Sequence, residues 1–219
     1  MIVKKSVNSL DGLRGKKIGV MRGTASQALY NSIIKYYKFN PGPAELINMD
    51  PTDMTTAFIR GDVEAIVLWE PQSTKARKLG NGKTLISGTR SYLGGASAEE
   101  RVYGDHAVLF ANESTLKEQP AVARSVIAAL QKATDFIEHN RSEATAILAK
   151  EYGLQPAEMK GILDVNGYTL RLDDQLTGDM EKQAAFLLAD KRITHSVRVT
   201  DMFDPSVLKS VKPGLVNIP

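Results

Sequence analysis

Short apolar runs alternate with helical stretches through the first half of the chain. The run 17–21 is bounded by Gly15 and Gly23, and it predicts a buried strand. The apolar residues that follow fall on one helical face, and the sequence Asn-Pro-Gly-Pro at 40–43 ends this helix. The alternation of strand and helix predicts a parallel or mixed sheet in an α/β lobe.

The pattern predicts further strands and helices up to residue 111. Strands are expected at 45–48, 63–69, 84–86 and 105–111, and helices between Asp50 and Gly61 and from Pro71 to Lys78. The second of these strands is a near-continuous apolar stretch, which is typical of a strand covered on both faces. Segment 87–104 carries glycines among charged residues, and we interpret it as a long loop, a feature that is often functional.

From residue 114 the pattern becomes mainly helical. Pro120 precedes apolar residues at helical spacing, which predicts a long amphipathic helix that ends at Asn140. Further helices are expected from 142 to 150, from 156, from 173 to 187 and near 207. No apolar run approaches the length that spans a membrane.

The composition is that of an ordinary globular protein. Hydrophobic residues make up 42% of the 219 residues and charged residues 24%, so disorder is a poor interpretation. The formal charge is +3, but Lys and Arg are scattered among 25 acidic residues without a basic stripe interleaved with aromatics. Nucleic acid is therefore not an expected partner, whereas the charge is compatible with attraction of small anions.

Signals of catalysis and metal binding are lacking in the sequence. The chain has no cysteine, which excludes disulfides, thiolate metal sites and Cys nucleophiles. Its three histidines are far apart and have no metal-ligand spacing, and no GxSxG motif is present. We therefore expect a protein that is not an enzyme and that needs neither metal nor cofactor.

Small residues in the turn after the first apolar strand form the first candidate ligand site. They are Gly23, Thr24, Ala25 and Ser26. They let a ligand approach the backbone, where the first N–H groups of a helix are unpaired. The hydroxyls of Thr24 and Ser26 could add donors, and Arg22 is a candidate partner for an oxyanion. The alternatives are that the hydroxyls only cap the helix and that Arg22 is an unpaired surface residue.

Trp69 and Glu70 form the second candidate site. They stand where the apolar strand ends, and ligands of open α/β sheets bind beyond the carboxyl ends of strands. Trp69 could stack on a flat ligand, and Glu70 could accept from an amine or hold a basic neighbour. The alternative places Trp69 in the core and has Glu70 cap the next helix.

His106 and Arg90 are weaker candidates. His106 follows Asp105 at the expected second crossover, where it could donate to an anion. The alternative, which we favour, is a hinge histidine that is satisfied by its neighbours. Arg90 adjoins a glycine-containing turn and is a candidate anion partner, although a surface role is commoner for such an arginine.

Four sequence blocks resemble the solute-binding proteins of nitrate, sulfonate, taurine and thiamine-precursor transporters, the SsuA/THI5-like group. They are 13–24 (with LRGKKIGV and RGT), 57–65 (AFIRGDVEA), 68–71 (LWEP) and 107–140, which is similar to a return strand and a long helix. The order and spacing of the blocks carry the resemblance over nearly the whole chain. Asn166 to Tyr168 resembles a loop that approaches the ligand in some relatives.

The resemblance implies an α/β fold of the periplasmic binding protein type 2, in which two lobes have mixed sheets and flanking helices. Residues 1–15 are then the approach to the hinge crossover, 16–106 the second lobe, and 107–219 the mainly helical C-terminal part of the first lobe. The N-terminal part of the first lobe has no counterpart in this sequence. An incomplete lobe exposes apolar surface, which favours self-association or a partner.

The function that the resemblance implies is capture of a small anionic or heteroaromatic ligand by lobe closure, followed by delivery to an ABC transporter permease. Such a protein is periplasmic, or extracellular and lipid-anchored. Residues 1–5 are too short an apolar stretch for a signal peptide, so none is expected in this chain. The alternatives are an enzyme on the same fold, similar to menaquinone- or thiamine-precursor-pathway enzymes, and a ligand-sensing domain of a signalling protein.

Overall fold

The computed structural model describes residues 1–218, which form two compact units. Unit 1 comprises Met1–Asp105 together with Ala185–His195. Unit 2 comprises His106–Ala184 and the residues from Ser196 onward. The assignment of these units to the lobes of a binding protein stays a prediction.

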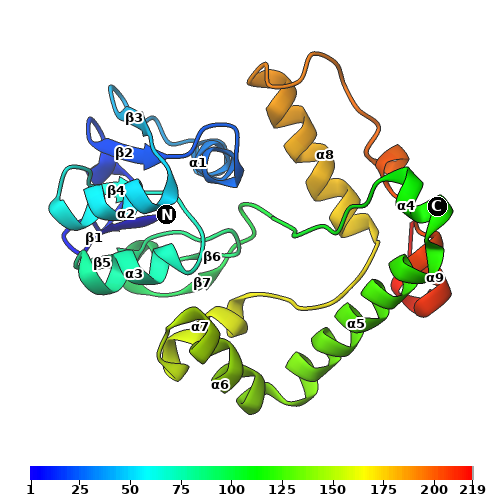
Figure 1. Cartoon of the computed structure of the whole chain (residues 1–219). Coiled ribbons are helices and arrows are strands. Elements are labelled where there is room, and N and C mark those ends of the chain that lie inside the picture. Colours follow the sequence, from blue (N-terminus) through cyan, green and yellow to red (C-terminus); the bar gives the residue numbers. More distant parts are fainter. Residues whose placement is uncertain (219) are drawn as a thin grey trace. The chain divides into compact units, whose positions relative to one another are not determined.

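A five-stranded mixed sheet forms the centre of unit 1 (Figure 1). Its strands are β1 (Ile2–Lys4), β2 (Lys17–Val20), β3 (Glu45–Asn48), β4 (Ala65–Ile66) and β5 (Gly82–Thr84). Their order is β3-β2-β4-β1-β5. β2 runs parallel to β3 and β4, and β1 runs antiparallel to β4 and β5. The first residues of the chain are thus part of the same sheet.

Helix α1 (Ala25–Tyr36) covers one face of the sheet. Its Tyr30 and Ile33 belong to a buried cluster that includes Ile18 and Val20 of β2. Side chains alternate between the faces of a strand, so Ile18 and Val20 point to the same side. α1 is therefore fixed by apolar burial against alternate residues of the central strand.

Helices α2 (Pro51–Arg60) and α3 (Gln72–Leu79) belong to the second buried cluster, on the opposite face. Phe58 of α2 and Ala76 of α3 share this cluster with Ile66. α2 ends at Gly61, as predicted, and the φ of +88° at this glycine makes it a left-handed C-cap.

Two predicted strands differ in extent from the structure. The stretch 63–69 is regular only over β4, although the N–H of Val67 still donates to the carbonyl of Gly19 at 3.0 Å. β5 begins two residues before the expected strand 84–86, because its pairing with β1 sets Gly82 opposite Lys4. The apolar pattern marks what is buried, whereas the partner strand decides which residues are paired.

Segment 87–104 contains little regular structure, as predicted. It holds a two-stranded sheet of β6 (Arg90–Ser91) and β7 (Ala98–Glu99) and a 3₁₀ turn at Leu93–Gly95. Arg90 pairs with Glu99 at 3.5 Å between Nη2 and Oε1, on the same small sheet.

The prediction of a strand at 105–111 is wrong. Residues 107–111 make no hydrogen bond to the part of the chain that the structure describes. Their side chains are exposed, and Phe110 reaches 87%. Figure 1 draws this segment, on the way to α4, without a strand arrow. An apolar run forms a strand only where a neighbouring strand supplies its hydrogen bonds, and residues 1–218 supply none here.

Unit 2 is helical. Its helices are α4 (Glu113–Glu118), α5 (Pro120–His139), α6 (Arg141–Tyr152), α7 (Pro156–Val165), α8 (Asp174–Ala189) and α9 (Ser206–Val211), of which α8 ends in unit 1. Two short 3₁₀ turns lie at Val199–Met202 and Pro213–Leu215. Ala149, Met159 and Leu163 form its buried cluster between α6 and α7.

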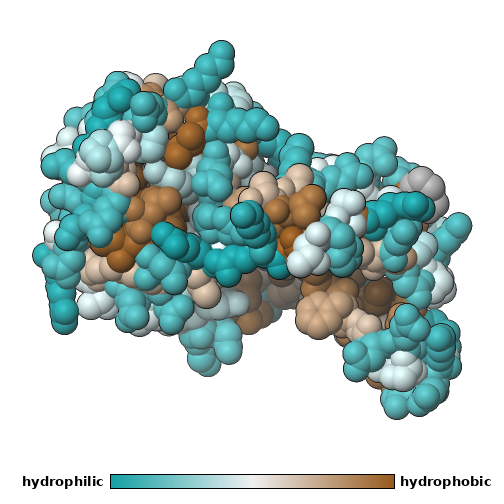
Figure 2. All heavy atoms as spheres, turned by 90° about the horizontal axis from the view of Figure 1, so that it is seen from above, coloured by the Kyte–Doolittle hydropathy of each residue, from teal (hydrophilic) through white to brown (hydrophobic). Residues whose placement is uncertain are grey.

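Several apolar side chains of α5 remain exposed. Val122, Val126 and Leu130 recur every fourth residue and so share one helix face. Figure 2 shows hydrophobic residues gathered in patches between hydrophilic ones on the face that it displays. Among residues 1–218, no helix has the length and hydropathy needed to cross a membrane.

Candidate functional site

The connections that follow β2 and β4 lead to opposite faces of the sheet. β2 is followed by α1 on one face, and β4 is followed by α3 on the other. Neighbouring parallel strands with this arrangement leave a crevice at their carboxyl ends, which is the usual ligand position in open α/β sheets. The turn at 22–26 and the residues from 67 to 70 lie at this position.

Thr24 is the N-cap of α1. Its hydroxyl donates to the carbonyl of Met21 at 2.8 Å and accepts from the N–H of Ser26 at 3.2 Å. The preceding Gly23 has a φ of +75°, a conformation that a side chain disfavours. The side chain of Thr24 is thus used to shape the turn, as in the capping alternative.

Ser26 ties the ends of two strands together. Its buried hydroxyl donates to the carbonyl of Val67 after β4 and accepts from the N–H of Met21 after β2 at 3.0 Å. Both hydrogen-bonding roles of this hydroxyl are therefore occupied within the protein. Ser26 therefore holds the two strand ends of the crevice together. The donors that the turn can offer a ligand are its backbone N–H groups.

The free donors of the turn are backbone N–H groups. Those of Thr24 and Ala25 have no hydrogen-bond partner among the described residues. They lie at the N-terminus of the 12-residue helix α1, where the helix dipole places partial positive charge. This geometry suits an anion.

Trp69 lies outside the core. Its side chain is 45% exposed, so the alternative that buries it in the core is wrong. It follows β4 at the same edge of the sheet as the turn after β2. Trp69 is the single tryptophan of the chain.

Glu70 serves the protein itself. Its Oε2 accepts from the N–H of Thr74 in the first turn of α3, and its Oε1 pairs with Arg77 at 3.0 Å. Burial by itself raises the pKa of Glu70, but hydrogen bonds from Ser73 and Thr74 and the guanidinium of Arg77 outweigh it. The net pKa lies below the usual value, which keeps the carboxylate ionised. The helix-capping alternative therefore describes Glu70, and so does the prediction that it holds a basic neighbour.

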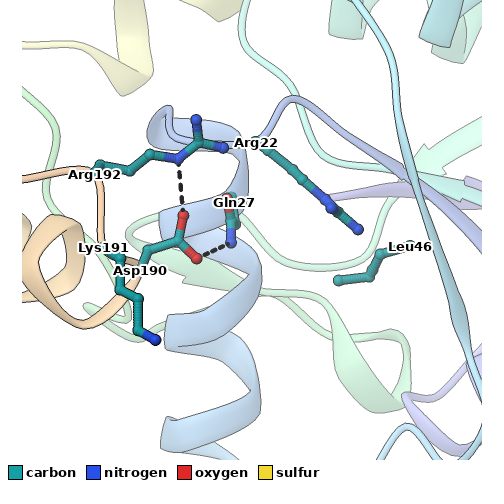
Figure 3. Close-up of a pocket in the computed structure, with 6 residues that line it drawn as sticks. All are labelled: Arg22, Gln27, Leu46, Asp190, Lys191 and Arg192. Atoms are coloured by element: carbon teal, nitrogen blue, oxygen red, sulfur yellow. Dashed lines mark hydrogen bonds and ion pairs between the residues drawn. The ribbon is translucent and has the colours of Figure 1, made fainter.

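Arg22 lines a pocket of about 530 Å³ beside the turn (Figure 3). The other lining residues are Gln27, Leu46, Asp190, Lys191 and Arg192. The backbone N–H of Arg22 donates to Oδ1 of Asn48 at 2.9 Å, and its guanidinium has no partner among the described residues. Sequence reasoning missed Asp190, Lys191 and Arg192. No local sequence pattern indicates that residues this distant in the chain lie beside the turn.

His106 belongs to unit 2 and is paired there. Its Nε2 lies 2.9 Å from Oδ2 of Asp179, a carboxylate that is buried. The arrangement supports the structural alternative for His106. Tyr168 packs on the cluster of Met159 and Leu163. Burial raises the pKa of its hydroxyl, Arg141 lowers it by a smaller amount, and Tyr152 raises it slightly further.

Residues 1–218 contain no group of three or more His, Cys, Asp or Glu side chains arranged to hold a metal ion. The arrangement at the sheet edge offers instead backbone donors, an exposed indole and nearby cations. Such groups bind and orient a small molecule, but they do not form an acid–base pair.

The model of the family described as NMT1/THI5 like matches residues 1–144. The taurine-binding periplasmic protein of Escherichia coli K12 is 24% identical over 190 residues, which cover 83% of this chain and 57% of that protein. The chain spans about half the length of the curated relatives it matches.

Two solved structures share the fold. The periplasmic aliphatic sulphonate-binding protein SsuA of Escherichia coli superimposes with a TM-score of 0.71 at 18% identity, over 93% of this chain and 64% of that one. The desulfurization enzyme DSZB superimposes with a TM-score of 0.64 at 13% identity, over 97% of this chain and 75% of that one. These likenesses confirm the predicted α/β fold of the periplasmic binding protein type 2.

Proposed function

The chain belongs to the NMT1/THI5-like family, and we propose that it acts as the solute-binding component of an ABC importer. It captures a small ligand of the nitrate, sulfonate, taurine or pyrimidine class by lobe closure and delivers it to the permease. Its location is the periplasm or, in a lipid-anchored form, the outer face of the cell membrane. The curated relatives that bear the names of taurine- and sulfonate-binding proteins support this proposal.

The single observation that carries the proposal is the turn between β2 and α1 at the carboxyl edge of the sheet. The N–H groups of Thr24 and Ala25 have no partner there among residues 1–218, and the exposed Trp69 stands at the end of the neighbouring strand. An oxyanion accepts hydrogen bonds from the backbone, while the indole walls the organic part of the ligand. An organic sulfonate, which has an oxyanion at one end and an organic group at the other, fits this arrangement.

The pairing of Glu70 also supports an anionic ligand. An unpaired carboxylate at the sheet edge would repel an anion, but the charge of Glu70 is compensated by Arg77 at 3.0 Å. The cations of the adjoining pocket then dominate the field that a ligand meets.

Ligand titration of the whole chain tests the proposal. The ligands are taurine, ethanesulfonate, nitrate, bicarbonate and an aminopyrimidine, and the readouts are melting temperature and Trp69 fluorescence. A ligand at one hundred times its dissociation constant stabilises the folded chain by about 2.7 kcal/mol. Trp69→Phe should abolish the fluorescence response and keep the thermal shift. The proposal is wrong if no ligand changes either quantity.

An enzyme on the same fold is the second candidate, because the desulfurization enzyme DSZB superimposes on nearly the whole chain. The absence of cysteine excludes a thiol nucleophile in this chain. Incubation with an aromatic sulfinate and a search for released sulfite would detect such an activity. The binding proposal expects no product over a day.

We also propose that the chain associates with a second copy through residues 107–111. Their side chains are exposed and apolar, and their backbone groups have no partner within residues 1–218, so they form an edge on which another strand can add. A second copy carries the same edge and can pair with it around a two-fold axis.

A further inference from the structure

Cations outnumber carboxylates around the turn that begins α1. Arg22, Lys191 and Arg192 line the pocket there, and Asp190 is the one carboxylate among the described residues that line it. The partial positive charge at the N-terminus of α1 adds to this excess. Positive groups that gather around one turn are stabilised when an anion binds among them.

Arg192 lies directly against the turn. A Cβ atom placed on Gly23 would be 3.2 Å from Nε and 3.3 Å from Cζ of Arg192. In Figure 3 its side chain crosses above the first turn of α1. The absence of a side chain at Gly23 leaves the space that the guanidinium fills.

Asp190 orients Arg192. Its Oδ2 accepts from Nε of Arg192 at 3.1 Å, and its Oδ1 accepts from Nε2 of Gln27 at 3.1 Å. Gln27 in turn accepts from the N–H of Gly23 at 2.7 Å. The carboxylate thus fixes the guanidinium through one nitrogen. The two terminal amino groups of Arg192 have no partner among the described residues.

Arg22 supplies a second guanidinium at the same end of α1. Its backbone is held by Asn48, and in Figure 3 its side chain extends from the turn toward Leu46, which also lines the pocket. Arginine presents planar donors that match the oxygens of sulfonate, sulfate or carboxylate groups. The described part of the chain provides no counter-ion for Arg22.

We propose that Arg192, held by Asp190, and Arg22 are the residues that select a negatively charged oxyanion head group in the ligand. This inference rests on the proposed function and adds the residues that determine its specificity. One of them, Arg192, lies in a segment whose Asp190 is 163 positions after Gln27. Arg192 contacts the head group, whereas Asp190 and Gln27 are positioning residues.

The test compares Arg192→Gln with Arg198→Gln as the matched control. Both changes remove one positive charge, but Arg198 lies in unit 2 and pairs with Asp201. Trp69 fluorescence is titrated with ethanesulfonate and with ethanesulfonamide, its neutral analogue. The wild-type chain should prefer the sulfonate. Arg192→Gln should weaken sulfonate binding about tenfold or more, and Arg198→Gln should change it less than twofold.

The Arg192→Lys variant separates the contribution of the positive charge from that of the planar donors. The lysine variant should recover part of the affinity, because it restores the charge without the planar donors. Equal sulfonate affinity of the wild type and Arg192→Gln overturns the inference and leaves the proposed function intact.

Thermal protection by sodium sulfate, compared with sodium chloride at equal ionic strength, covers the case in which no organic ligand binds. Protection of the wild type but not of Arg192→Gln then upholds the anion-selecting residues and refutes the sulfonate receptor. If sulfate changes the melting temperature of the wild type and of Arg192→Gln equally, both the anion-selecting role of the arginines and the sulfonate receptor are refuted.

Discussion

Gln27 and Asp190 are joined by a hydrogen bond of 3.1 Å between Nε2 and Oδ1, although 163 positions separate them in the sequence. The same glutamine accepts from the N–H of Gly23 at 2.7 Å. One side chain thereby fixes the turn that presents backbone donors and the segment that presents Arg192. The shape of the candidate site depends on this residue, which touches no ligand in our proposal.

Gln27→Ala should destabilise unit 1. It leaves the N–H of Gly23 and one oxygen of Asp190 without their partner, at a cost of about 1 to 2 kcal/mol in the free energy of unfolding. Urea denaturation measures this loss. Asn31→Ala, an exposed change on the same helix, should cost less than about 0.5 kcal/mol. Equal stability of the two variants would show that the hydrogen bonds of Gln27 contribute nothing.

Glu70 should make stability depend on pH. Its pKa is lowered in the folded chain, so its contribution is complete above the unfolded pKa of about 4.3 and is lost as the pH falls through the folded value. Glu70→Gln should lower the free energy of unfolding at pH 7 by about 1 to 3 kcal/mol. The difference from wild type should shrink below about pH 4.

Chemical denaturation between pH 3 and pH 8 measures this dependence. Glu118→Gln, at an exposed position at the end of α4, serves as the control and should run parallel to wild type. A constant difference between Glu70→Gln and wild type over the whole range would contradict the lowered pKa.

His106→Ala should affect stability and leave ligand affinity unchanged. Its removal takes the imidazole away from the buried carboxylate of Asp179, at a cost of about 1 to 3 kcal/mol. His139→Ala is the control, because His139 is exposed and its side chain bonds, among residues 1–218, only to the carbonyl of Asp135 in its own helix. A loss of sulfonate affinity in His106→Ala without a loss of stability would identify His106 as a ligand contact.

Phe110→Glu should weaken self-association. The side chain of Phe110 is exposed within an unpaired apolar segment, and a carboxylate there opposes the approach of a second copy. Sedimentation velocity over a range of concentrations should show a smaller shift toward dimer than for wild type. Leu79→Glu adds the same charge at an exposed residue of unit 1 and should leave the association unchanged. A monomeric wild-type chain would refute the association itself.

The sequence determined the local framework of the site. The apolar run of β2, the small residues after it and the periodic face of α1 predict strand, turn and helix, and the structure confirms all three. Such features depend on residues within a few positions of one another, so propensity and spacing are enough to specify them. The cap of α2 at Gly61 follows from the same local rules.

Tertiary structure decided which groups remain available to a ligand. The hydroxyl of Ser26 donates to the carbonyl of Val67, and the carboxylate of Glu70 pairs with Arg77. From the sequence alone, both side chains could equally have been free to contact a ligand. Arg192 reaches the turn only because the fold returns the chain to α1. The apolar pattern at 107–111 predicts a strand, but no strand among residues 1–218 pairs with it. Hydrogen bonds and ion pairs join residues across the fold, and their partners are fixed only when the chain has brought distant segments together.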